Sequence, residues 1–218
     1  MTRRNRRIIV GSVLLMVFMA ISYDLLDRPL SLFCRDLDPE IVQVFQWITE
    51  LGVSTGYLFG LAVLFVFFKF IRPRALAARR ALFLFAAIAI SGVAINLIKP
   101  LVGRLRPKLL FEGNLYGFDP FRIGYEYNSF PSGHATTVFA LATALTLFFP
   151  RWRLPLFGFA AVIGLSRIVV GAHYLSDVMG GAYVGIMTVF LLVLLCRRSG
   201  WMDFPGDSDM ENACLKQA

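Results

Sequence analysis

The sequence predicts an all-helical protein whose helices cross a membrane six times. Of its 218 residues, 57% are hydrophobic and only 17% are charged, a balance that soluble domains rarely reach. A transmembrane helix needs roughly 20 apolar residues, and the chain contains six apolar runs close to that length, too many for one soluble core to hide. The predicted spans are residues 8–23, 53–70, 81–98, 135–149, 154–170 and 178–196.

These spans belong to a single membrane-embedded domain over residues 1–200, followed by a polar tail at 201–218 that we expect to be disordered. The first span follows four arginines, as a secretory signal peptide would, but no small-residue cleavage site comes after it. We therefore interpret it as a retained helix.

A short additional helix is predicted before the second span, at about residues 38–51. Asp38-Pro39-Glu40 has the order of an N-cap, a first-turn proline and an acidic first turn. The apolar residues that follow at helical spacing are Ile41, Phe45 and Ile48. This segment either lies in the membrane interface or extends the second span.

The basic residues predict the topology, because lysines and arginines that flank spans stay in the cytoplasm. The N-terminus, the loops after the second and fourth spans, and the end of the sixth span are basic without acidic neighbours. We therefore expect both termini in the cytoplasm, and the net charge of +8 requires no nucleic acid partner. The first loop should lie outside because of its acidic residues, which are Asp24, Asp27, Asp36, Asp38, Glu40 and Glu50.

The third loop is basic although it should also lie outside. Its segment KPLVGRLRPK contains Lys99, Arg104, Arg106 and Lys108 within ten residues. The segment either contacts anionic lipid head groups or binds another anion. Downstream, Pro131-Ser132-Gly133 opens the fourth span, where a helix N-terminus either binds phosphate or is simply capped.

The chain has two histidines, and both lie at the outer ends of spans. His173 and Asp177 are four residues apart, so in a helix the carboxylate would lie one turn from the imidazole. A hydrogen bond between them would fix the imidazole tautomer and raise its basicity. The three cysteines predict neither a disulfide framework nor a metal cluster, because they lie far apart, at Cys34, Cys196 and Cys214.

Together these segments resemble the three-part signature of the type 2 phosphatidic acid phosphatase (PAP2) superfamily. The parts are Lys99 with Arg106-Pro107, then Pro131-Ser132-Gly133-His134, then Ser166-Arg167 with His173 and Asp177. The resemblance implies a PAP2/haloperoxidase-like helical core. It also implies that His173 attacks phosphorus, that Asp177 orients it and that His134 is the general acid and base. The residues implied to bind phosphate are Lys99, Arg106, Ser132, Gly133 and Arg167.

The implied activity is hydrolysis of a membrane lipid phosphate without metal or cofactor, at the extracytoplasmic face of a bacterial inner membrane. Candidate substrates are undecaprenyl pyrophosphate, phosphatidylglycerophosphate, phosphatidic acid and lipid A phosphates, and no obligatory protein partner is evident. A lipid phosphotransferase and, more remotely, a proton-coupled transporter remain as alternatives. A metal site on His134, His173 and Asp177 is disfavoured because the neighbouring cations would repel a metal ion.

Two expectations concern the third loop. Its aromatic stretch at residues 111–130 either covers the site and holds a head group or anchors the loop in the membrane interface. Arg104 lies outside the motif positions, so we expect its side chain to point away from the site and Arg104→Ala to be mild.

Overall fold

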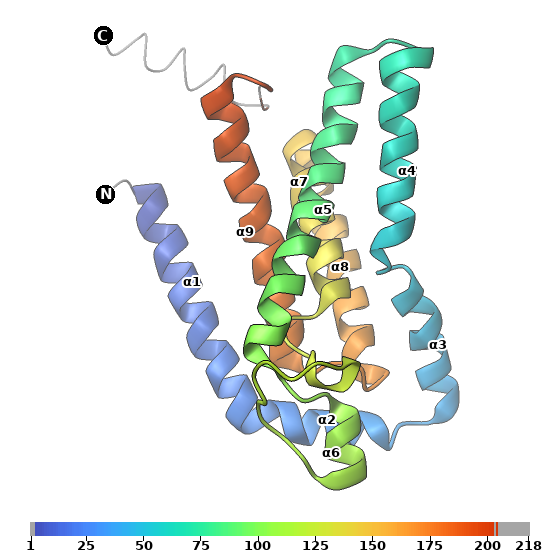
Figure 1. The fold of residues 1–218 in the computed structure, drawn as a ribbon, viewed down its shortest axis with the longest axis vertical. Coiled ribbons are helices and arrows are strands. Elements are labelled where there is room, and N and C mark those ends of the chain that lie inside the picture. Colours follow the sequence, from blue (N-terminus) through green and yellow to red (C-terminus); the bar gives the residue numbers. More distant parts are fainter. Residues whose placement is uncertain (1–2, 203, 205–218) are drawn as a thin grey trace.

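The computed structural model describes residues 3–202 and 204, which form a bundle of helices (Figure 1). Between the helices, the described residues contain one isolated β-bridge, from Arg104 to Phe118. The helices are α1 (Arg3–Ile21), α2 (Asp27–Arg35), α3 (Pro39–Glu50), α4 (Ser54–Val66), α5 (Ala75–Val102), α6 (Pro107–Gly113), α7 (Gly133–Phe148), α8 (Arg153–Val169) and α9 (Leu175–Ser199). Short π-helical turns at Ser22–Leu26 and Phe67–Ile71 extend α1 and α4, and 3-10 turns lie at Tyr125–Tyr127 and Pro150–Trp152.

Helix α7 is the centre of the bundle and packs against α5, α8 and α9. Its contact with α9 is close because α9 carries glycines on the facing side. A Cβ atom at Gly181 would lie 2.4 Å from the Ser132 carbonyl oxygen, and one at Gly185 would lie 2.5 Å from the Thr136 carbonyl oxygen. Any larger residue would push the helices apart, so these glycines let the first turn of α7 lie against the second and third turns of α9.

The described helices fit a membrane protein, as the sequence predicts. Five helical stretches are long and apolar enough to cross a membrane: Ile8–Arg35, Pro39–Ile71, Ala75–Val102, Pro150–Val169 and Leu175–Ser199. The remaining predicted span, the fourth at residues 135–149, corresponds to α7, which is apolar but has only 16 residues. The count of six spans therefore stays a prediction. In Figure 1 the start of α1 and the end of α9 lie at one end of the bundle, and α2 and α6 lie at the other.

The predicted additional helix is present as α3, separate from α4. Asp38 caps it by accepting a hydrogen bond from the Glu40 backbone N–H at 2.8 Å. Phe45 and Ile48 pack toward α8 and the core, but Ile41 in the first turn is 45% exposed. The buried polar residue of this helix is Thr49, which also faces the core.

Two predicted boundaries differ from the structure. The chain stays helical from α1 through α2 instead of ending in a solvated loop, and Asp27 is only 1% exposed. At the other terminus, Met202 and Phe204 are buried against Phe83 and Phe148, because the aromatic rings of this part of the predicted tail complete an apolar cluster. The rest of the predicted disordered tail, including Cys214, lies outside the described residues.

Candidate active site

The basic segment that follows α5 is extended, and later residues of the same loop form backbone hydrogen bonds with it on both of its edges. Helix α5 ends at Gly103, where φ is +60° and a Cβ atom would lie 2.0 Å from the Asp119 carbonyl oxygen. The backbone then pairs in both directions: the Arg106 N–H donates to the Glu126 carbonyl at 2.9 Å, and the Ser129 N–H donates to the Arg104 carbonyl at 2.9 Å. These bonds fix where both arginine side chains start.

Lys99 and Arg106 converge on the carbonyl groups of the same loop. Lys99 Nζ donates to the Asn128 carbonyl at 3.0 Å. Arg106 donates from each of its three nitrogens, to the carbonyls of Tyr125 (2.9 Å), Ala172 (2.8 Å) and Asn128 (3.2 Å), and its guanidinium lies 3.8 Å from the centre of the Tyr125 ring. A guanidinium has five N–H groups, so two remain for an anion.

Arg167 comes to the same place from the end of α8. It is 8% exposed, and its Nη1 donates to Thr49 Oγ1 of α3 at 2.6 Å. Its Nε and the Ser132 hydroxyl are buried without a hydrogen-bond partner in the described structure. Buried polar groups in proteins are nearly always paired, and the first N–H groups of α7, from Gly133 on, have no partner within the helix. The Arg167 Nε–H, the Ser132 hydroxyl and the first N–H groups of α7 together form a set of donors suited to a bound oxyanion.

His173 and Asp177 face each other across the start of α9. His173 lies before the helix, and Asp177 is the third residue within it, where Oδ2 accepts hydrogen bonds from the Tyr174 N–H (2.9 Å) and Ser129 Oγ (2.6 Å). His173 Nδ1 is 3.6 Å from the same Oδ2, longer than a normal hydrogen bond. The sequence predicts a hydrogen bond within one helical turn, whereas in the structure His173 precedes the helix and the two groups are adjacent without being bonded. Catalytic hydrogen bonds are often long before substrate binds.

The imidazole of His173 is only 2% exposed, and its surroundings keep it neutral. Burial lowers the pKa of His173 to about 3, and the charges of Arg106 and Lys99 act in the same direction. Asp177 opposes this shift but does not cancel it. At neutral pH one ring nitrogen therefore carries a lone pair, as a nucleophile requires.

His134, the second predicted histidine, is the second residue of α7 and is half-buried. It packs against the junction of α3 and α4, where a Cβ atom on Gly52 would come within 2.7 Å of His134 Cδ2. The structure thus brings both histidines, Asp177 and the predicted phosphate-binding residues together from α5, α7, α8, α9 and the connecting loops.

Arg104 is the correction to the sequence prediction. Its side chain is 2% exposed and forms ion pairs with Asp27 and Asp177, each at 2.6 Å. The prediction that it points away from the site was wrong, because residues two apart in an extended chain face the same side. That alternation was visible in the sequence, whereas nothing there linked Asp27, Ser129 or Thr49 to the site.

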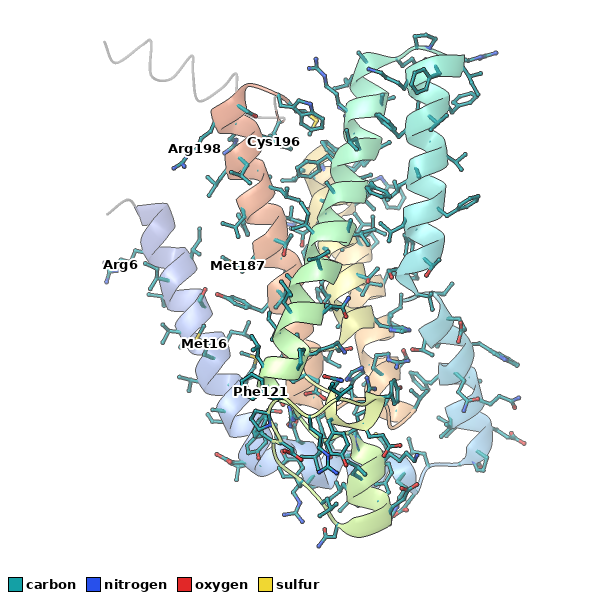
Figure 2. All side chains as sticks on the ribbon, viewed as in Figure 1. Arg6, Met16, Phe121, Met187, Cys196 and Arg198 are labelled. Carbon is teal, nitrogen blue, oxygen red and sulfur yellow. The ribbon has the colours of Figure 1, made fainter. Side chains whose placement is uncertain are left out.

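A cavity of about 430 Å³ opens beside Lys99 and Arg106. The aromatic loop forms part of its wall through Tyr125 and Asn128, while Ile123 at its rim is 95% exposed. Phe121 is 73% exposed at the same end of the bundle, away from Arg6 and Arg198 (Figure 2). The other residues that line the cavity are Asn96, Pro100 and Arg122.

The fold and the site define a class: a helical membrane protein with a buried His–Asp pair that faces a cluster of cations. Residues 80–201, more than half of the chain, match the family model described as the PAP2 superfamily, and the chain belongs to this family. This finding confirms the resemblance that the three sequence motifs indicate.

Similar proteins include the lipid A 1-phosphatase of Rhizobium etli, 39% identical over 118 residues that cover 54% of this chain and 51% of the relative. The undecaprenyl-diphosphatase BcrC of Bacillus subtilis is 41% identical over 63 residues, which cover 29% of this chain and 33% of the relative. The chain spans about half the length of the lipid A 1-phosphatases of Rhizobium that it matches.

Two solved structures have the same fold. LpxE of Aquifex aeolicus superposes with a TM-score of 0.58 and 27% identity, over 77% of this chain and 94% of that one. A PAP2 type phosphatidylglycerolphosphate phosphatase from Bacillus subtilis superposes with a TM-score of 0.61, over 85% of this chain and 96% of that one. Its identity of 22% makes this second likeness one of fold alone.

Proposed function

We propose that the protein is a metal-independent phosphatase that hydrolyses a membrane lipid phosphate or pyrophosphate through a phosphohistidine intermediate. The observation that carries the proposal is the placement of His173, a buried neutral imidazole between the carboxylate of Asp177 and the cations Lys99 and Arg106. A phosphate monoester is an anion, so this cluster of cations attracts the substrate and stabilises charge on the transferring phosphoryl group.

In the first half of the reaction, His173 Nε2 attacks the phosphorus atom, and the bond from phosphorus to the leaving oxygen breaks. His134, whose imidazole takes up a proton when the anionic phosphate binds beside it, donates that proton to the leaving oxygen, while Asp177 holds the proton on His173 Nδ1. The nonbridging oxygens are bound by five groups: Lys99, Arg106, Arg167, the Ser132 hydroxyl and the N-terminus of α7. In the second half, His134 takes a proton from water, the water oxygen attacks phosphorus, and the P–N bond breaks to release phosphate.

The substrate in this proposal is a lipid whose tails stay in the bilayer while its phosphate enters at the end of the helices. Relatives named lipid A 1-phosphatase and undecaprenyl-diphosphatase support lipid A and polyprenyl pyrophosphates as the first substrates to test. Arg6 near the start of α1 and Arg198 at the end of α9 lie at the end of the bundle opposite Phe121 of the loop that lines the site (Figure 2). By the positive-inside rule this favours cytoplasmic termini and an extracytoplasmic site in a bacterial inner membrane.

The test is phosphate release by purified protein in detergent, with lipid A, undecaprenyl pyrophosphate, phosphatidylglycerophosphate and phosphatidic acid as substrates. We expect at least one of them to release phosphate in the presence of excess EDTA. We also expect protein quenched in alkaline detergent to retain a ³²P label that is stable in base, is lost in acid and is absent from His173→Ala. Loss of activity in EDTA, or release from none of the four, would contradict the proposal. Label that moves into a second lipid instead of free phosphate would identify the phosphotransferase alternative.

A further inference from the structure

A buried network of charges connects the N-terminal helices to the catalytic pair. Asp27, the first residue of α2, is 1% exposed and lies outside residues 80–201, which match the family. Its Oδ1 accepts hydrogen bonds from Ser22 Oγ (2.9 Å) and the Ser176 N–H (3.0 Å). Its Oδ2 accepts from Arg104 Nη2 (2.6 Å) and from the Ser176 hydroxyl. The carboxylate is therefore fully bonded in one orientation.

Arg104 connects this carboxylate to Asp177. Its Nη1 donates to Asp177 Oδ1 at 2.6 Å and also to Ser176 Oγ. The other oxygen of Asp177 is the one that faces His173. The two oxygens of Asp177 thus differ in role, because Oδ1 is held by Arg104 whereas Oδ2 is directed at the imidazole.

Aromatic rings enclose the guanidinium. Its carbon lies 4.7 Å from the ring centre of Tyr174 and 5.1 Å from that of Tyr23. Burial alone lowers the pKa of Arg104, but Asp177 and Asp27 raise it above the ordinary value of an arginine, so the side chain stays a cation. A single rigid fork between two carboxylates fixes both of them, which a flexible ammonium group does not do.

Packing alone does not require such a network, because replacing buried ion pairs with apolar residues of similar volume is often neutral or stabilising. The two carboxylates and one guanidinium carry one net negative charge, and this charge lies behind His173. The imidazole gains positive charge when it attacks phosphorus, so the network lies where it stabilises that change.

We propose that Asp27 is a positioning residue, which through Arg104 fixes the carboxylate of Asp177 and thereby the tautomer and orientation of His173. The proposal rests on the function proposed above. It gives the N-terminal helices a role in catalysis in addition to the membrane anchoring that their apolar length suggests.

The test compares Asp27→Asn with Asp24→Asn in the full-length protein. Asp24 is the matched control, because it lies in the adjoining π-helical turn but is exposed. We expect Asp27→Asn to lower kcat about 10- to 100-fold with KM within about 3-fold, as misplaced catalytic groups do. We expect Asp24→Asn to leave both constants within about 2-fold of wild type, as an exposed substitution away from the site should.

Imidazole ¹⁵N shifts supply a second readout that needs no substrate. The chain has two histidines, so the His173 signals are assigned by their loss in His173→Ala. We expect wild-type His173 to carry its proton on Nδ1 and Asp27→Asn to show a mixture of tautomers. Ser176→Ala is the second variant, to be used if Asp27→Asn folds poorly. It removes a single hydroxyl from the network, so we expect a smaller shift of the His173 tautomer ratio in the same direction.

A folded Asp27→Asn protein with unchanged kcat and an unchanged tautomer would overturn the proposal. So would a loss of activity that only matches the loss of folded protein in thermal unfolding. Failure of the proposed function looks different, because then wild-type protein itself releases no phosphate, while the tautomer comparison still decides the role of Asp27.

Discussion

Gly52 and His134 touch so closely that a methyl group does not fit between them. A Cβ atom at residue 52 would lie 2.7 Å from His134 Cδ2 and 2.8 Å from the side chain of Ile163. The junction between α3 and α4 therefore forms part of the wall that holds His134, the proposed general acid.

Gly52→Ala should displace His134 and slow the reaction. Overpacking of this kind costs about 1–3 kcal/mol, and we expect kcat/KM on the lipid substrate to fall about 10-fold or more. Gly56→Ala is the control, because a Cβ atom there meets nothing within 4 Å. Steady-state kinetics of both variants in detergent check this, and equal activities would argue against contact between residue 52 and the general acid.

The two histidines should respond differently to the leaving group. His173→Ala should abolish turnover and phosphoenzyme formation on every substrate. His134→Ala should lose about 10²- to 10⁴-fold on a lipid phosphate, the usual contribution of a general acid, but much less on an aryl phosphate whose leaving group needs no proton. Equal losses by both variants on both substrates would show that the assigned roles are wrong.

Arg106 and Arg167 should not tolerate lysine. Arg106 holds three carbonyls at once, and Arg167 reaches Thr49, while each presents further N–H groups toward the site. A lysine ammonium lacks this planar fork, so we expect both Lys variants to lose activity about as severely as the Ala variants. Lys108→Ala is the control: Lys108 is exposed, pairs with Glu126 and should change turnover little. Similar small losses at all three positions would instead support a general basic patch.

Arg104→Ala should be severe, contrary to what its place outside the motif suggests. The substitution leaves Asp27 and Asp177 buried without their shared cation. Breaking a buried ion pair by removing one partner costs about 3–5 kcal/mol, so we expect a lower unfolding temperature together with lost turnover. Thermal unfolding and kinetics measured on the same preparation check this, and a stable, active Arg104→Ala protein would contradict it.

His173 should make stability depend on pH. Its pKa is about 3 in the folded protein and 6.5 as the ordinary value, so between these values the unfolded chain binds one more proton. The stabilisation is fully present above pH 6.5 and is lost as the pH falls toward 3, by up to about 1.4 kcal/mol per pH unit. Thermal unfolding from pH 7 to 4 should therefore show a steeper decline in wild type than in His173→Ala. Parallel declines would show that His173 is not buried as a neutral group.

Sequence reasoning found the helical bundle and the motif residues because their signals are local. Apolar runs of bilayer length predict helices, and His173 and Asp177 lie only four positions apart in the sequence. The network behind them has no such signal: Arg104 meets Asp27 across 77 positions, and Arg167 meets Thr49 across 118. Such pairs form because α2 and α3 fold back onto the ends of α8 and α9, a tertiary arrangement that no periodicity in the chain encodes.

The pairing of Asp27 with the start of α9 also has a consequence for biosynthesis. Ser176 follows Asp27 by 149 positions, so at about 5–20 residues per second its synthesis lags by roughly 7 to 30 s. Arg104, which is 77 positions after Asp27, is made about halfway through that interval, so the carboxylate first has neither partner and then lacks Ser176. An unpaired ionisable group in a membrane helix is costly. The buried carboxylate of Asp27 thus has all of its partners only after the start of α9 has been made, so the two ends of this network depend on segments synthesised far apart in time.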